Sequence, residues 1–289
     1  MKTKDWTAFI GLSLAWGSSF LWIKIAVQEI GPFALVGWRL LFGIVGLLVV
    51  VAIRRPEWPR QRKVWLALLV LGLTNTAIPF VLISWAELYI DSAVASILNS
   101  SVPLFTMVIA HLLLTDDRMT RQRVLGLLIG FLGVVVLVWR DLSAGLEFNL
   151  LAQGAMILAV LFYAGSSVFA RRNTQGLSPT VQALVPLITA DIVIWGIAPF
   201  AEGPLTLPQI SLTWIALLWL GLIGSCIAYL LYFYLLHAVG PTRATMVTYT
   251  FPVIGVLLGV IFLKERLDVY LILGAALVVS SLLVVNRKT

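Results

Sequence analysis

Polar side chains and a proline interrupt an otherwise apolar stretch at ILNSSVPLFT, residues 97–106. Asn99 and Ser100 stand in the turn before Pro103, which lacks a backbone N–H and crowds the carbonyl four residues earlier. A helix bends at such a place, and nearby amide and hydroxyl groups can satisfy the freed backbone groups. Because an unpaired polar group in hydrocarbon costs several kcal/mol, the stretch predicts either a packing kink or a kink that lines a polar cavity.

The same pattern recurs about 149 residues later, where Thr248, Tyr249 and Thr250 precede Pro252. Other apolar segments carry small polar or aromatic residues near their centres: Trp16, Ser18, Ser19, Asn75, Thr76, Pro79, Tyr163, Ser166, Ser225 and Tyr229. Together these side chains predict a cavity of hydroxyls, amides and aromatic rings, with the three prolines as hinges or kinks. Such a lining suits a small, roughly neutral solute and not phosphate, which favours arginine clusters. Close helix packing is the competing explanation for the small residues.

Two charged side chains fall within apolar segments. Arg39 lies in the outer third of its segment and has the length to reach the interface. Asp191 lies at the centre of its segment and is too short to do so, so it must be protonated or paired. We interpret these residues as a coupling site or as a structural interhelical contact. His111 and His237 are far apart, so neither a metal site nor a cofactor is expected.

The elements that must position these residues are membrane-spanning helices. Of the 289 residues 61% are apolar and only 11% charged, and the mean hydropathy is +1.02. A soluble domain carries about 25% charged residues, so this composition indicates an integral membrane protein. The apolar runs are continuous and near the ~20 residues that span a bilayer, which predicts an all-α fold of ten helices. These helices are expected at 5–25, 33–53, 64–86, 93–114, 124–139, 150–170, 180–200, 213–236, 243–263 and 269–286.

The basic residues indicate the orientation of the helices. With a cytoplasmic N-terminus, all but five of the 20 Lys and Arg side chains lie inside; the exceptions are Lys24, Arg39, Arg140, Lys264 and Arg266. The positive-inside rule then predicts that both termini are cytoplasmic. The basic excess is explained by topology, so no nucleic-acid partner is expected, and the predicted location is the cell (inner) membrane.

The two halves of the chain resemble each other. The segment Gly72–Ala86 aligns with Gly221–Leu235, and the alignment of the polar turns places Pro103 over Pro252. We therefore predict two five-helix repeats, residues 1–145 and 146–289. Because five is odd, the second repeat is inverted, an arrangement found in secondary transporters whose substrate site lies at the midplane between repeats.

The sequence also resembles the EamA family of the drug/metabolite transporter superfamily. The resemblance rests on the five-plus-five plan, Trp16-Gly17-Ser18-Ser19, Arg39, the polar-then-proline fourth helix and Leu263-Lys264-Glu265-Arg266. The first half departs from the last motif with Thr115-Asp116-Asp117-Arg118. The resemblance implies export of small metabolites, and the aromatic and neutral amino-acid exporters of the family share this length and plan.

The predicted function is therefore an inner-membrane secondary transporter that exports neutral or aromatic amino acids by alternating access. Export or exchange of another small metabolite or a drug is the alternative. An intramembrane enzyme or a channel is a different class, but the sequence carries neither a catalytic Gly-x-Ser-Gly pattern nor pore-ring charges. The expected partners are a small-molecule substrate and the lipid bilayer, with a monomer as the working unit and a homodimer as the alternative.

Overall fold

The computed structural model describes residues 2–114, 120–143, 147–204 and 207–286, and within these ranges all regular structure is helical. Eight helices are long and apolar enough to cross a membrane, and two shorter apolar helices cover Val124–Trp139 and Val269–Ser281. The predicted all-α membrane class is therefore confirmed. The long helices are Thr3–Ala26, Pro32–Arg54, Arg62–Ala86, Ser92–Leu113, Asn149–Asn173, Pro179–Glu202, Ser211–Val239 and Arg243–Leu263.

Several of these helices consist of more than one element. In the first half the elements are α1 (Thr3–Gly17), α2 (Ser19–Ala26), α3 (Pro32–Arg54), α4 (Arg62–Gly72), the π-helix η1 (Leu73–Ala77), α5 (Ile78–Ala86), α6 (Ser92–Asn99), α7 (Val102–Leu113) and α8 (Arg121–Ser143). In the second half they are α9 (Glu147–Asn173), α10 (Pro179–Glu202), α11 (Ser211–Leu218), the π-helix η2 (Trp219–Ile227), α12 (Ala228–Val239), α13 (Pro241–Thr245), the 3-10 helix η3 (Met246–Thr250), α14 (Phe251–Leu263) and α15 (Val269–Asn286).

Three of the interruptions are each followed directly by a proline, whereas η2 and the break between α1 and α2 have none. Pro79 opens α5 directly after the wide turns of η1, and Pro103 opens α7 after α6 has ended at Asn99. Pro252 opens α14 after the tight turns of η3. Proline removes the donor that the preceding turn needs, so that turn relaxes into π, 3-10 or broken geometry.

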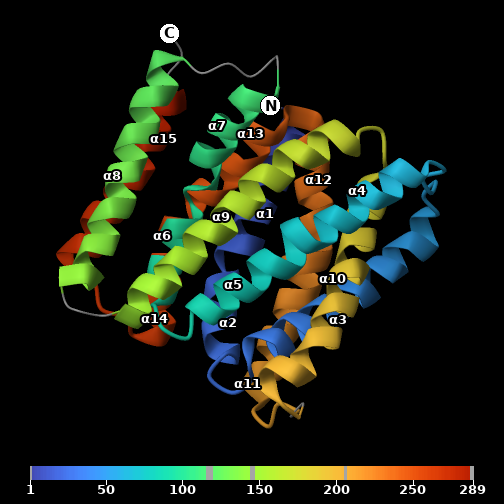
Figure 1. Ribbon diagram of the computed structural model, residues 1–289, viewed down its shortest axis with the longest axis horizontal. Helices are drawn as coiled ribbons and strands as arrows, with labels where there is room; N and C mark the ends of the chain where they lie inside the picture. The colour runs from blue at the N-terminus through green and yellow to red at the C-terminus, as the bar shows by residue number, and fades with distance from the viewer. Residues whose placement is uncertain (1, 115–119, 144–146, 205–206, 287–289) are drawn as a thin grey trace.

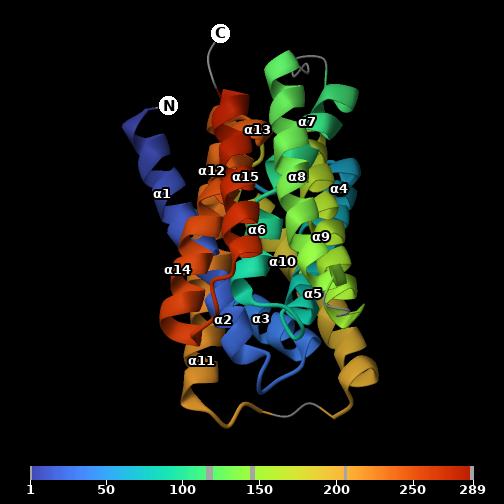
Figure 2. The ribbon, with the colours of Figure 1, turned by 90° about the vertical axis from the view of Figure 1, so that its left-hand side faces the viewer.

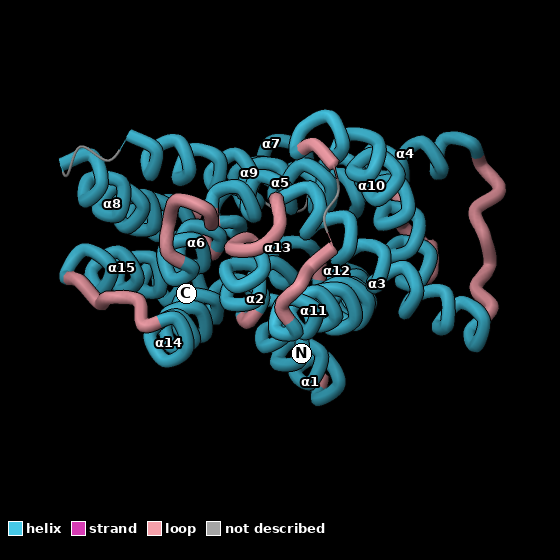
Figure 3. Tube along the Cα trace, turned by 90° about the horizontal axis from the view of Figure 1, so that it is seen from below, coloured by secondary structure: helices cyan, strands magenta, loops and turns pink. Residues whose placement is uncertain are grey.

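The helices form one bundle in which the two halves are interleaved (Figure 1). Across the halves α1 packs on α12, α3 on α10 and η2, and α6 on α14. At one edge α8 lies along α15 (Figures 1 and 3), and a Cβ on Gly133 would stand 2.9 Å from the Gly274 carbonyl oxygen. Small residues at such crossings allow the backbones to approach closely. Much of the core is therefore an interface between the first and second halves.

Large apolar side chains cover the outside of the bundle, including Ile53, Leu112, Ile192 and Phe200. A soluble protein would not expose so many of them, whereas lipid tails solvate them well. The buried core contains leucines and aromatic rings contributed by both halves. This distribution agrees with a multi-pass membrane protein.

The helices α1 and α15 respectively begin and end at the same face of the bundle, which we call the terminal face (Figure 2). At the opposite face three glutamates bind backbone N–H groups of the other half of the chain. Glu202 accepts from Phe33 N at 2.7 Å and Ala34 N at 3.0 Å, and a Cβ at Gly31 would collide with its carboxylate. A carboxylate at a helix N-terminus satisfies unpaired donors and complements the helix dipole.

The other two glutamates also accept from backbone N–H groups of the other half, Glu265 with both carboxylate oxygens and Glu29 with Oε1 alone. Glu265 accepts from Ser92 N at 2.8 Å and Ala93 N at 3.0 Å, at the start of α6. Glu29 accepts from Gln209 N and, at 3.0 Å, from Ile210 N, just before α11. These hydrogen bonds, with that from Thr213, lower the pKa of the Glu29 carboxyl. We call Glu29, Glu202 and Glu265 the three interhelical caps; they join the halves at the face opposite the termini.

Candidate functional site: a cavity between the two halves

A cavity of ≈ 70 Å³ lies inside the bundle. A single water needs about 10–15 Å³ of such space, so the cavity has room for roughly five waters. Both halves of the chain line it, with Trp16, Ser19, Phe20, Ile23, Arg39, Asn75, Phe80, Ile83, Asn99, Val102, Tyr163, Tyr229, Tyr232, Thr245, Thr248 and Phe251. Arg39 is the one charged residue of this lining. No three His, Cys, Asp or Glu side chains converge as metal ligands within the described ranges.

The lining residues follow helical spacing within each half. In α1 and α2 they are residues 16, 19, 20 and 23, and elsewhere several lie three residues apart, such as Asn99 with Val102 and Tyr229 with Tyr232, while Arg39, Asn75 and Tyr163 stand alone. Residues three or four apart share one face of a helix. Each helix therefore presents a single narrow face to the cavity.

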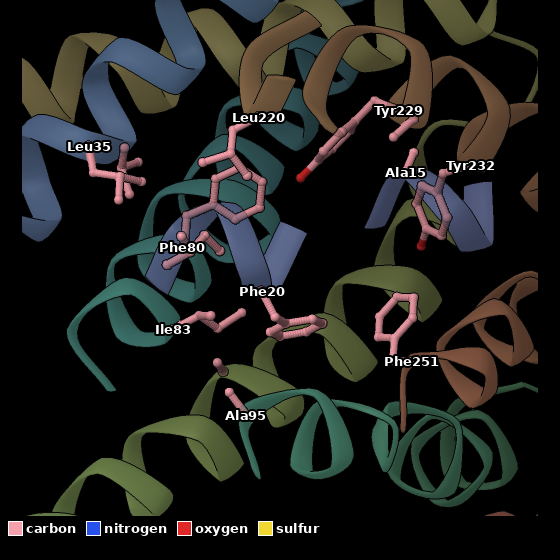
Figure 4. Packing of buried hydrophobic residues seen from close by; sticks show 14 of the residues in the cluster. Ala15, Phe20, Leu35, Phe80, Ile83, Ala95, Leu220, Tyr229, Tyr232 and Phe251 are labelled. Carbon is pink, nitrogen blue, oxygen red and sulfur yellow. The ribbon is translucent and has the colours of Figure 1, made fainter. Parts of the chain in front are cut away.

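Seven of the sixteen lining residues are aromatic, and Figure 4 shows five of them, Phe20, Phe80, Tyr229, Tyr232 and Phe251. Phe20 and Phe251 pack edge to face with ring centroids 5.6 Å apart. Trp16 contacts both Tyr229, at 5.9 Å, and Tyr232, at 5.3 Å. Aromatic side chains have few rotatable bonds and pack in preferred geometries, so this wall is stiff and apolar with polar edges.

The two π-helices each present a backbone carbonyl to a side chain of the other half. Pro79 cannot donate to the carbonyl of Asn75, and this oxygen accepts instead from the Tyr229 hydroxyl at 3.0 Å. Gly224, which aligns with Asn75 in the second half, accepts from the Trp16 indole N–H at 3.0 Å. These two carbonyls thus hold two wall residues, Trp16 and Tyr229, in place.

Arg39 is 4% exposed and lies under the same wall. Its Nε donates to Ser225 Oγ at 3.0 Å, and its Nη2 is 3.5 Å from the Gly224 carbonyl oxygen. The guanidinium carbon stands 3.8 Å from the centroid of the Phe80 ring, within cation–π range. Ser225 in turn donates to the Leu220 carbonyl at 2.9 Å, which orients its oxygen as an acceptor for Arg39.

The structure places some of the sequence-predicted site residues on the cavity and others outside its lining. Those on the cavity are Trp16, Ser19, Arg39, Asn75, Asn99, Tyr163 and Tyr229. Those outside the lining are Ser18, Thr76, Ser100, Ser166, Ser225, Tyr249 and Thr250, together with Pro79, Pro103, Pro252 and Asp191.

Local hydrogen bonds explain where several of the second group lie. Ser18 accepts from the Trp219 indole at 3.1 Å, and Ser166 donates to Thr74 Oγ1 at 2.9 Å. Ser100 and Thr250 bond carbonyls of their own helical turns. Asp191 is half-buried on α10, and its Oδ1 has no hydrogen-bond partner. Asp191 does not line the cavity.

The sequence pattern had indicated Thr248, which lines the cavity, but sequence reasoning passed over Thr245 and the apolar part of the lining: Phe20, Ile23, Phe80, Ile83, Val102 and Phe251. The available signal was helical spacing. Phe20 and Ile23 lie four and seven residues after Trp16, and Val102 lies three after Asn99. Extending each polar position along its own helix face would have found them.

Known proteins of similar sequence agree on one family. A model described as the EamA-like transporter family matches the chain twice, over residues 6–139 and 150–287. An "Uncharacterized transporter" of Archaeoglobus fulgidus is 28% identical over 99% of both chains. The "Uncharacterized inner membrane transporter YedA" of Escherichia coli is 29% identical over 87% of this chain and 80% of its own length.

A solved structure titled only "Crystal structure of protein" is similar in fold, with a TM-score of 0.70 over 99% of this chain and 98% of that one. At 21% identity this likeness concerns the fold alone. The two family matches cover nearly all of the described helices, so the agreement does not depend on one motif. The chain belongs to the EamA-like transporter family and is a multi-pass membrane transporter.

Proposed function

We propose that this transporter exports neutral amino acids, aromatic ones included, across the inner membrane by alternating access around the central cavity. The observation that carries the proposal is that aligned residues of the two halves line the same space. Phe80 and Ile83 align with Tyr229 and Tyr232 at the shift of 149 residues. Asn99 and Val102 align in the same way with Thr248 and Phe251.

The proposed frame is ten helices in two inverted repeats, with both termini in the cytoplasm and the terminal face inside. Two separate family matches, one in each half, support the repeats. The aligned π-helices η1 and η2, and the aligned interruptions before Pro103 and Pro252, support them further. The proposed boundary at 145/146 and the departing motif at 115–118 lie outside the described residues.

Alternating access needs a closed face that opens. The three interhelical caps join the halves at the face opposite the termini, which the proposed orientation makes the outer face. With a cavity of ≈ 70 Å³, an aromatic amino acid of a dozen or so heavy atoms does not fit without movement of the walls. We infer that breaking the caps accompanies release of the solute to the outside.

The character of the lining supports a small amphipathic solute. Aromatic rings offer apolar contacts, hydroxyl and amide groups offer directional hydrogen bonds, and Arg39 is the one charged group. The whole cavity lies within one chain, which supports a monomer as the working unit. The relative named an inner membrane transporter supports the location.

Counterflow in proteoliposomes tests the function directly. Vesicles loaded with unlabelled amino acid should accumulate labelled leucine or phenylalanine, and Thr248→Ala should reduce the initial rate severalfold. Thr250→Ala is the matched control, because it removes the same hydroxyl from a neighbouring position outside the lining and should leave the rate unchanged. Movement of a sugar or a polyamine, with no movement of any amino acid, would refute the substrate assignment.

A further inference from the structure

Arg39 is a buried cation that faces a cavity and has no acidic side chain of the described residues within ion-pair distance; the buried Glu87, which lies outside the cavity lining, attracts it only from farther away. It is 4% exposed, and none of the acidic side chains in the described ranges forms an ion pair with it. None of the other cavity-lining residues is acidic. A buried charge is normally paired, because its own attraction to a counter-charge must replace the water that it has lost. The cavity therefore lacks an anion that its lining would stabilise.

The hydrogen bonds of Arg39 leave a defined part of the guanidinium unused. A guanidinium has five N–H donors. One, on Nε, is taken by Ser225 and one, on Nη2, by the Gly224 carbonyl, so three remain without a protein acceptor in the described structure. Both N–H groups of Nη1 and one of Nη2 belong to this set, and adjacent N–H groups of this kind bind a carboxylate in a two-pronged manner.

The contacts also hold the guanidinium still. The Phe80 ring covers one of its faces at 3.8 Å, and Ser225 anchors its Nε side. The guanidinium of Arg39 is therefore fixed, and three of its N–H donors have no acceptor among the described residues. Such a group is suited to bind a planar anion.

A complementary acceptor lies elsewhere in the cavity. Asn99 is 6% exposed and lines the cavity, and its Oδ1 has no hydrogen-bond partner. Because Pro103 has no N–H, the backbone carbonyl of Asn99 also lacks its usual donor four residues on. Asn99 therefore offers two acceptors at the end of α6, where the helix dipole favours positive charge.

We propose that Arg39 binds the carboxylate of the transported solute and that Asn99 accepts hydrogen bonds from its amino group. The inference rests on the proposed transport through this cavity and names the residue that recognises the carboxylate shared by the proposed substrates. It makes Arg39 a specificity-determining residue and not only a structural one. The carboxylate also supplies the negative charge that the protein leaves out of the lining.

Competition against labelled leucine, with three unlabelled compounds of similar shape, tests the assignment. Leucine has both groups, leucinamide lacks the carboxylate, and 4-methylpentanoate lacks the amine. In the unmodified protein, we expect leucine to compete at least ~10-fold better than leucinamide, because the amide leaves the charged donors unpaired. In Arg39→Gln this preference should disappear, and Arg39→Lys should restore part of it.

Ligand-induced shifts of the melting temperature provide a second measurement that does not need transport. Arg39→Gln in detergent should remain folded and lose the shift given by leucine, whereas Thr250→Ala should keep it. If Arg39→Gln still prefers leucine over leucinamide, the carboxylate assignment is wrong. If 4-methylpentanoate is transported and leucine is not, Arg39 keeps its role, while the amino-acid proposal and the role of Asn99 both fail.

Discussion

Glu265 offers a direct test of how the face opposite the termini stays closed. Its two carboxylate oxygens accept from Ser92 N and Ala93 N at 2.8 and 3.0 Å, so a residue that follows α14 holds the first turn of α6. In Glu265→Gln one acceptor and the negative charge are lost, while the shape of the side chain is kept. The substitution therefore removes half of the cap without creating a cavity.

The expected size of the effect follows from these two contacts. Loss of one hydrogen bond to a charged acceptor costs roughly 1.5 kcal/mol at the lower end of its range, which suits a half-buried group. Loss of the charge at a helix N-terminus adds about 0.5 kcal/mol. The sum of about 2 kcal/mol corresponds to a shift of about 30-fold towards the state in which α6 and the end of α14 have separated.

Cysteine accessibility measures this shift. The only cysteine, Cys226, is first replaced by alanine, and Thr248→Cys then places a single thiol on the cavity. Intact spheroplasts are treated with an impermeant maleimide, which reaches the cavity only when the outer face opens. Glu265→Gln should raise the labelling rate by about 30-fold, and Arg266→Gln, an exposed neighbour, should leave it unchanged.

A second substitution separates the cap from the charge. At Gly259 an added Cβ would collide with the Glu265 carboxylate, so Gly259→Ala should displace the carboxylate and increase labelling as well. If both variants fold and label at the unmodified rate, the cap does not control closure and the reasoning fails. A labelling rate that rises equally in Arg266→Gln would refute it too, because the effect would then be one of surface charge.

Three further substitutions have expected outcomes in unfolding experiments in detergent. Burial, reinforced by the nearby Glu265, raises the pKa of the Glu87 carboxyl well above its ordinary value, against the opposing effects of Lys24 and Arg39. Because the folded-state pKa is the higher one, the fold loses stability as the pH rises above the unfolded pKa of Glu87, and regains it as the pH falls. Glu87→Gln removes this loss and should therefore raise the melting temperature at pH 8 more than at pH 6. An equal rise at both pH values would contradict this. Tyr229→Phe removes the donor to the Asn75 carbonyl and should cost about 1 kcal/mol in chemical denaturation, whereas Tyr232→Phe, whose hydroxyl makes no hydrogen bond in the described structure, should cost less. Gly221→Ala would bring a Cβ within 2.8 Å of the Arg39 carbonyl oxygen and should destabilise by about 1–3 kcal/mol, while Gly154→Ala, which meets open space, should be neutral or stabilising.

The sequence alone was sufficient for the class of the fold and for the family. Continuous apolar runs of membrane-spanning length indicate helices, because a helix satisfies all of its backbone hydrogen bonds within the segment that crosses the lipid. The positions of Pro79, Pro103 and Pro252 likewise indicated where helices would be interrupted, since proline removes a donor whatever the surroundings. Such properties are local: each depends on a residue and the few that precede it.

Which face of each helix meets the cavity was decided by tertiary contacts. Ser18 and Ser19 are adjacent and chemically the same, yet Ser19 lines the cavity while Ser18 meets the Trp219 indole. About 100° of helical rotation separates such neighbours, and the phase of that rotation is set by packing against a partner helix.

The same reason applies to the chemistry of the site. Arg39 in the sequence is a charge that can reach the membrane interface, whereas in the structure it is held inside by Ser225 and Phe80, 186 residues and about 40 residues away along the chain. The carbonyls of Asn75 and Gly224 accept hydrogen bonds from Tyr229 and Trp16 across the two halves. Sequence determined which groups were present in the membrane, and the packing of one half against the other determined which of them face the solute.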